Sequence, residues 1–400
     1  MLTFIDNLTL LQIILIFLAI LVVNLGFIFL VRIHIETLYK KTNSIEQAMD
    51  RLRVLSQYLY MVVIVISSFS IAFLLMMKLV DALGDSTFTF ILSIVSSFIF
   101  LGAMITINQL VIAKTAKKIR DTEATMKEET SDTIRGLLFI FVPITLVLTV
   151  MQLIPDNFLN GAGTFIFPII IIVLIPLATA PFTGKMLKAT AMPESAVKQE
   201  LVQFLTSLNI ENVQLYVWPT KKKKMANALV TGFTKKKQIY IADYMLENMT
   251  MEEVKSVLAH EIGHIKKRHL WKRLGLLISI FVLISGFGYG MEWYETHVGT
   301  ISIWLGVAII LGLLLFGFAV VFRYFSRVHE READAYVLYV NIDYRDYAGA
   351  LMKLATLNHS LTKMNKLDES FQTHPSIARR IHWIIEQANG SIEEVQAYLE

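Results

Sequence analysis

The residues best suited by type and spacing to do chemistry are His260, Glu261 and His264, which read H-E-x-x-H. On a helix, positions four apart lie on one face, so the two imidazoles can ligate one metal ion. Glu261 then lies beside that ion, where its carboxylate can take a proton from water that the metal activates. Three fixed residues also match by chance, so the motif alone suggests a metal-dependent hydrolase and its surroundings must decide.

The sequence around these residues predicts a helix. Thr250 and Glu253 form a capping box, which is a typical helix start. Val254, Leu258 and Ile262 follow at helical spacing. An amphipathic helix that merely happens to carry two histidines is the alternative interpretation, and a third ligand would decide between the two.

Catalytic zinc sites use three protein ligands and keep one position open. One known continuation of the motif needs a Gly and then a His at a fixed spacing, but here the Gly is missing and His269 falls one residue early. A second needs an Asp-Gly pair, which the chain lacks. A third needs a distant helix with Glu-x-x-x-Asp, and Glu330 and Asp334 supply it.

Glu330 and Asp334 are one helical turn apart and share a face. Glu330 is predicted to complete the metal site, and Asp334 to accept the free ring N–H of His260 and so fix its orientation. Glu332 points elsewhere on such a helix and is the less suitable ligand. His329 is a rival, but a neighbour in sequence faces about 100° away from Glu330.

The segment from Ser326 to Asp334 resembles the S-R-x-x-E-x-x-A-D signature of the membrane gluzin metallopeptidases. This group includes the type I CAAX prenyl proteases and the HtpX-type quality-control proteases. The resemblance covers about residues 194–386 and extends to the segments around Asn227-Ala228, Leu258–Ile265, Arg268-His269, His374–Ser376 and Arg380.

This resemblance implies a gluzin-like α+β zinc metalloprotease domain with one Zn²⁺ per chain. By resemblance, Asn227 and Ala228 belong to an edge strand that pairs with an extended substrate. His374 and Arg380 resemble residues near the active site, and either could stabilise the oxyanion during hydrolysis. An ordinary surface hairpin remains the alternative for Asn227 and Ala228, and a structural role before Pro375 the alternative for His374.

The composition predicts an α-helical polytopic membrane protein. Apolar residues make up 55% of the chain, and it has no Cys, which excludes disulfides and thiolate chemistry. Seven apolar stretches are long enough to cross a bilayer core of about 30 Å. They are Leu8–Val31, Leu55–Met77, Phe88–Ala113, Gly136–Ile154, Thr164–Thr183, Leu274–Met291 and Val298–Phe322.

The connections between these stretches alternate in charge. Lys and Arg gather after the first, third, fifth and seventh stretches, while the other connections carry mainly Asp and Glu. The positive-inside rule therefore predicts a multi-pass cell-membrane protein with an extracytoplasmic N-terminus and a cytoplasmic C-terminus and active site. The expected division is a membrane region at 1–192, a first catalytic half at 193–273, two spans at 274–322 and a second catalytic half at 323–400.

Within the catalytic halves, the pattern predicts a helix from about residue 193 to Leu208, a strand at Val213–Val217 and a hairpin of 227–232 with 238–242. The region after Arg323 is expected to be helical. Lysine runs at 221–224 and 235–237 are read as solvated loops, with contact to anionic lipid headgroups as the alternative.

Together these features predict an integral membrane zinc endopeptidase that cleaves membrane-associated proteins at the cytoplasmic side. The net charge of +4 is small, and no nucleic-acid partner is predicted. The peptide or membrane-protein substrate itself does not follow from the sequence. One alternative keeps the chemistry and assigns quality-control cleavage of damaged membrane proteins. Another is a transporter or receptor with a relic site, but a relic would be free to lose any member of the motif.

Overall fold

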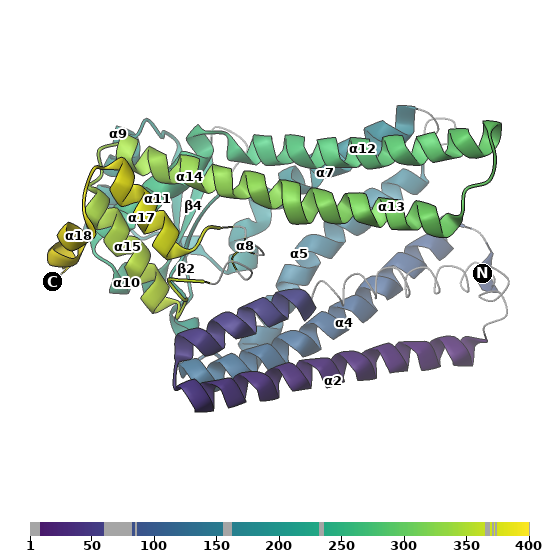
Figure 1. The fold of residues 1–400 in the computed structure, drawn as a ribbon, viewed down its shortest axis with the longest axis horizontal. Helices are drawn as coiled ribbons and strands as arrows, with labels where there is room; N and C mark the ends of the chain where they lie inside the picture. The colour runs from purple at the N-terminus through teal and green to yellow at the C-terminus, as the bar shows by residue number, and fades with distance from the viewer. Residues whose placement is uncertain are drawn as a thin grey trace. The chain divides into compact units, whose positions relative to one another are not determined.

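The computed structural model describes residues 9–59, 82–84, 86–154, 162–231, 236–364, 369, 372 and 374–399. Contacts divide the chain into two compact units, Met1–Ile154 and Pro155–Glu400. Figure 1 shows the ribbon, in which helices predominate. Each unit is described by itself below.

The first unit is built from long apolar helices: α2 (Leu10–Thr42), α4 (Thr87–Arg120) and α5 (Met126–Gln152), with residues 45–59 also helical. Ile28 and Ile35 of α2 pack with Met104 of α4 in a buried cluster. Asn24 and Asn108 are both buried and exchange two amide hydrogen bonds of 2.9 and 3.0 Å. Paired amides satisfy each other where lipid could not, so they hold α2 against α4.

The second unit begins with α7 (Ala162–Thr179), η1 (Ala180–Phe182) and α8 (Thr183–Leu187). Two further long elements follow the catalytic motif, α12 (His269–His297) and α13 (Ile303–Phe316). The helix of α13 continues without a break through a π-helical segment, η3 (Gly317–Phe322), into α14 (Arg323–Tyr339). The last apolar stretch and the segment with Glu330 therefore form one rod.

Five helices among the described residues are long and apolar enough to cross a membrane. They coincide with the first, third, fourth, sixth and seventh predicted stretches. The fifth stretch overlaps a shorter apolar helix, and the second, Leu55–Met77, lies mostly outside the described residues. The chain is thus a mostly helical, multi-pass membrane protein.

The polar part of the second unit contains a four-stranded sheet in the order β1-β2-β4-β3. Its strands are β1 (Thr190–Ala191), β2 (Val213–Trp218), β3 (Ala228–Thr231) and β4 (Lys237–Ala242). The predicted hairpin is confirmed, because β3 pairs antiparallel with β4. The parallel pairing of β2 with β4 and the short β1 were not predicted.

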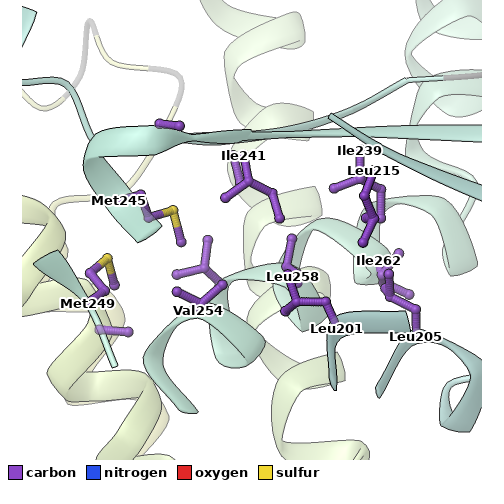
Figure 2. Close-up of a cluster of buried hydrophobic side chains, with 14 of the residues drawn as sticks. Leu201, Leu205, Leu215, Ile239, Ile241, Met245, Met249, Val254, Leu258 and Ile262 are labelled. Atoms are coloured by element: carbon purple, nitrogen blue, oxygen red, sulfur yellow. The ribbon is translucent and has the colours of Figure 1, made fainter. Parts of the chain in front are cut away.

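Helices pack on this sheet and on one another: α9 (Ala196–Ser207), α10 (Asp243–Asn248), α11 (Met251–Lys266), α15 (Tyr344–Leu357), α17 (Ile377–Gln387) and α18 (Ile392–Leu399). Figure 2 shows the main core, where Ile239 and Ile241 of β4 face Leu258 of α11 and Leu201 of α9. These four side chains are fully buried. Burial of this face fixes the rotation of α11, and so directs His260 and His264 to its other side.

Candidate metal centre

The first two ligands of the candidate site come from α11. Thr250 caps this helix as predicted, accepting from the Glu253 backbone N–H, while the Glu253 side chain accepts from the Thr250 N–H. The Nε2 atoms of His260 and His264 lie 3.2 Å apart. One helical turn thus aims both imidazoles at the same point.

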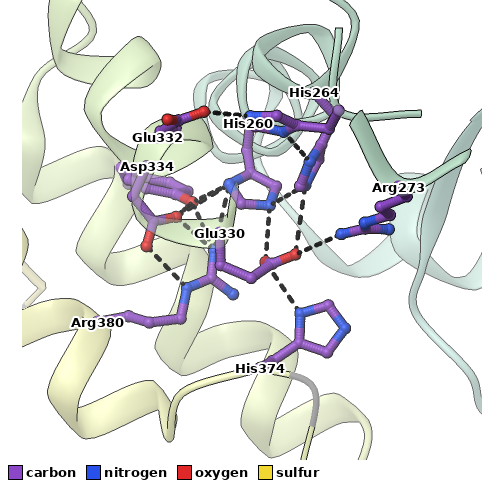
Figure 3. A network of polar contacts seen from close by, with 10 residues as sticks. His260, His264, Arg273, Glu330, Glu332, Asp334, His374 and Arg380 are labelled. Atoms are coloured by element: carbon purple, nitrogen blue, oxygen red, sulfur yellow. Dashed lines mark hydrogen bonds and ion pairs between the residues drawn. The ribbon is translucent and has the colours of Figure 1, made fainter. Parts of the chain in front are cut away.

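The third ligand comes from α14, which lies across α11 at very short range. A Cβ at Gly263 would lie 3.0 Å from the Ala333 Cα and 3.1 Å from its carbonyl oxygen. Only glycine allows this approach, and it brings Glu330 to the two histidines. The Glu330 oxygens lie 3.4 Å from the His260 Nε2 and 3.5 Å from the His264 Nε2 (Figure 3).

These three groups fit a metal ion. They are the one set of three potential ligands found among the described residues, and their ligand atoms all lie within 4.8 Å of one another. Zinc bonds of about 2.0–2.1 Å in tetrahedral geometry place ligand atoms roughly 3.3–3.5 Å apart, close to the separations above. Both Glu330 oxygens are buried, and neither accepts a well-formed hydrogen bond from the part of the chain that the structure describes. A buried carboxylate with both oxygens in that state favours a bound cation.

The charges of the site agree with this fit. Burial lowers the pKa of His264 to about 3, so this imidazole is neutral and can offer a lone pair. Burial and Arg380 also lower the pKa of His260, but the carboxylates of Asp334 and Glu330 outweigh them and raise it to about 9. Between these carboxylates the site therefore favours a positive charge.

Asp334 lies behind His260, with its Oδ1 2.9 Å from the His260 Nδ1. Two further side chains hold Asp334: the Tyr347 hydroxyl donates to it at 2.6 Å, and the Arg380 guanidinium donates at 2.6 and 3.1 Å. Burial raises the pKa of Tyr347 well above its ordinary value, so the hydroxyl stays protonated and donates. His260 is thus fixed from behind by Asp334 and Tyr347, which are fully buried, and by Arg380, which is mostly buried.

Two other acidic residues lie near this triad. Glu261 is partly buried; burial raises the pKa of its carboxyl, and the neighbouring charge of Glu330 raises it further. Glu332 points away from the triad, to His269 and Lys272. The structure therefore brings Glu330, and not Glu332, to the histidines.

The remaining predicted site residues surround the triad. His374 is mostly exposed, and its Nδ1 lies 2.9 Å from a Glu330 oxygen. Arg380 contacts Asp334 rather than the open side of the site. Asn227 is exposed just before Ala228, which begins β3, and β3 lies at one edge of the sheet against α11.

Three nearby residues were not predicted to belong to the site. Tyr347 has no motif that marks it, and it reaches Asp334 only because α15 packs against α11. His269 contacts His264, although the sequence suggested only a position after the ligand helix. Arg273 lies 3.7 Å from the other Glu330 oxygen. Its place one helical turn after His269 was the only feature of the sequence that could have indicated this contact.

A helical membrane protein with this ligand set has the features of a membrane metallopeptidase, and comparison with known proteins agrees. Residues 191–388 match the family described as peptidase family M48. The match covers just under half of the chain, and the proteins of this family are metalloproteases. The resemblance noted in the sequence is confirmed.

The relatives include both groups named above. CAAX prenyl protease 1 homolog of Arabidopsis thaliana is 26% identical over 239 residues, which is 56% of this chain and 54% of that protein. The chain thus spans about half the length of this relative. CAAX prenyl protease 1 of Saccharomyces cerevisiae is 25% identical over 345 residues, covering 76% of this chain and 75% of that protein. Protease HtpX homolog of Helicobacter acinonychis is 24% identical over 179 residues, covering 40% of this chain and 58% of that protein.

A solved structure shares the fold. The crystal structure of S. mikatae Ste24p matches with a TM-score of 0.60 at 20% identity, over 85% of each chain. The likeness extends well beyond residues 191–388, so it includes membrane helices as well as the peptidase domain.

Proposed function

We propose that this chain is an integral membrane zinc endopeptidase that cleaves membrane-associated proteins at the cytoplasmic side, similar to the type I CAAX prenyl proteases. The observation that carries the proposal is the triangle of His260, His264 and Glu330, with Glu261 between the two histidines. The predicted division of the chain, with two catalytic halves on either side of the last two spans, is part of this proposal.

Each residue of the site has its own role in peptide hydrolysis. Bound zinc would polarise the scissile carbonyl and lower the pKa of water in the site to about 7. Glu261 takes a proton from that water and passes it to the leaving amine. Its raised pKa suits both transfers, because a carboxyl whose pKa lies nearer the working pH can both take up and release a proton. Asp334 holds the Nδ1 of His260, which leaves Nε2 for the metal.

The oxyanion of the reaction needs a donor on the open side of the site. His374 is mostly exposed and next to Glu330, which suits that position. The Arg380 guanidinium already donates to Asp334 and Tyr347. We therefore favour His374 for the oxyanion, and for Arg380 a role through Asp334.

Substrate binding is proposed along β3. An edge strand offers main-chain hydrogen bonds to an extended peptide with little selectivity for side chains. Ala228 begins this strand and Asn227 directly precedes it, and β3 lies against the helix that carries His260. A peptide paired there would run past the metal site.

Quality-control cleavage is the second candidate function, supported by the similarity to HtpX homologues. The yeast CAAX prenyl protease aligns over 76% of this chain, against 40% for the Helicobacter protein. This broader match favours the first candidate. Cleavage of a farnesylated C-terminal peptide, compared with an unfolded membrane protein, would separate the two.

Peptide hydrolysis by the purified protein tests the shared chemistry. Glu261→Gln should retain zinc and lose at least about a hundredfold in kcat, because only the general base is removed. Glu252→Gln is the matched control, since Glu252 is an exposed carboxylate on the same helix. Turnover of Glu261→Gln close to that of the control would remove Glu261 from the mechanism.

A further inference from the structure

A second chain of contacts leads away from the metal site behind His264. The His264 Nδ1 lies 2.7 Å from the Nδ1 of His269. The other ring nitrogen of His269, Nε2, lies 2.7 Å from an oxygen of Glu332. Lys272 donates to the same Glu332 oxygen at 2.8 Å. His264 is thus joined through His269 to a carboxylate that is no ligand itself. Figure 3 labels His264 and Glu332, the two ends of this series of contacts.

A break between two helices produces this contact. On a straight helix His269, five positions after His264, would face about 140° away. Instead α11 ends at Lys266, and Arg268 adopts a left-handed conformation with φ of 56° before α12 begins at His269. This turn brings the imidazole of His269 back to His264.

His269 is held firmly in that place. Its side chain is only 1% exposed. Its ring stacks on that of His329, with centroids 4.3 Å apart and planes 14° from parallel. A ring held on one face and bonded at both nitrogens has no freedom to turn, so it can fix a neighbour.

One assignment of the ring protons satisfies every contact. The His264 Nε2 faces Glu330 and must carry a lone pair to bind a metal, so Nδ1 carries the proton and donates to His269. His269 accepts at Nδ1 and donates from Nε2 to Glu332. Both imidazoles are neutral, and each donor has an acceptor.

We propose that His269 and Glu332 are positioning residues that hold His264 as an Nε2 metal ligand. The inference rests on the proposed metallopeptidase function of the site. Asp334 does the same for His260 directly, and each ligand histidine then has a carboxylate behind it. His264 needs this support more, because 20% of its side chain is exposed, against 8% for His260.

Zinc affinity, measured by competition with a chelator, tests the proposal. His269→Phe keeps a flat ring against His329 but removes both nitrogens. Loss of such an outer partner should weaken zinc binding about 10–100-fold. Glu332→Ala should weaken it in the same direction, whereas Glu332→Gln, which still offers an oxygen to His269, should recover part of the loss. In cobalt-substituted protein, His269→Phe should also change the visible absorption, which reports ligand geometry.

The control variants are His382→Phe and Glu386→Gln, which replace exposed residues of α17. Both should bind zinc as the unaltered protein does. Zinc affinity of His269→Phe within about twofold of these controls, with an unchanged cobalt spectrum, would overturn the proposal. If His269→Phe does not fold, Glu332→Ala decides in the same way, since that side chain is 36% exposed. Unaltered protein that binds zinc but cleaves no peptide would contradict the proposed function alone, and the affinities would still decide the role of His269.

Discussion

Gly263 of α11 meets the backbone of Ala333 of α14, so closely that a Cβ on Gly263 would lie 3.0 Å from the Ala333 Cα. This contact sets the distance between the helix with the histidines and the helix with Glu330. The spacing of the metal site therefore depends on the absence of one methyl group.

Gly263→Ala should force the two helices apart. Overpacking of this kind costs about 1–3 kcal/mol, which equals or exceeds the roughly 1 kcal/mol that Ala gains over Gly in a helix. Thermal unfolding in detergent should occur at lower temperature, and zinc affinity should fall. Gly275→Ala is the control, because a Cβ there meets no atom within 4 Å and should leave both quantities unchanged or raise stability. Equal behaviour of the two variants would contradict the packing argument.

The ligand assignment predicts a contrast between two glutamates on α14. Purified protein should hold about one zinc per chain, and a strong chelator should remove it together with the activity. Glu330→Ala should remain without zinc even when zinc is supplied in excess. Glu332→Ala should load fully under those conditions, although it binds more weakly. Full occupancy in Glu330→Ala, with loss of zinc from Glu332→Ala, would reverse the assignment.

Tyr347→Phe should lower stability without abolishing zinc binding. The hydroxyl donates to the Asp334 carboxylate at 2.6 Å in a fully buried place. Hydrogen bonds to charged groups contribute about 1.5–3 kcal/mol, so the free energy of unfolding, measured in denaturant, should fall by about that amount. Tyr344→Phe is a suitable control because that hydroxyl bonds an exposed glutamate, Glu394, and should contribute less. A smaller loss for Tyr347→Phe than for Tyr344→Phe would count against its support of Asp334.

The alternating loop charges predict which regions face the cytoplasm. Because the chain has no Cys, single cysteines can be placed at Lys222 and at Glu295 and labelled on intact cells. An impermeant reagent should label Glu295→Cys, and should label Lys222→Cys only after the cells are opened. Labelling of Lys222→Cys on intact cells would place the catalytic domain outside.

The parts of the site that follow from local sequence were predictable. The capping box and apolar spacing located the ligand helix, and Glu-x-x-x-Asp placed Glu330 and Asp334 on one face. Contacts between distant elements were not predictable in the same way. Tyr347 reaches Asp334 through the packing of α15, and no pattern near Tyr347 encodes that.

Two further features depended on backbone geometry that composition does not reveal. The left-handed residue that turns His269 towards His264 is an arginine, although glycine or asparagine is usual there. The parallel pairing of β2 with β4 depends on which strands meet in space, whereas hairpin signals predict only neighbours in sequence.

The helix runs without interruption from α13 through η3 to α14, so the rotation of the membrane segment about the helix axis fixes the direction in which Glu330 points. Each residue of a helix turns the chain by about 100° and advances it by about 1.5 Å. One residue inserted or deleted within Gly317–Phe322 would therefore swing Glu330 away from His260 while leaving every ligand in the sequence. The wider π-helical turns lie at the point where the membrane segment passes into the catalytic segment. They set the angle, about the helix axis, between the membrane segment and the Glu330 carboxylate.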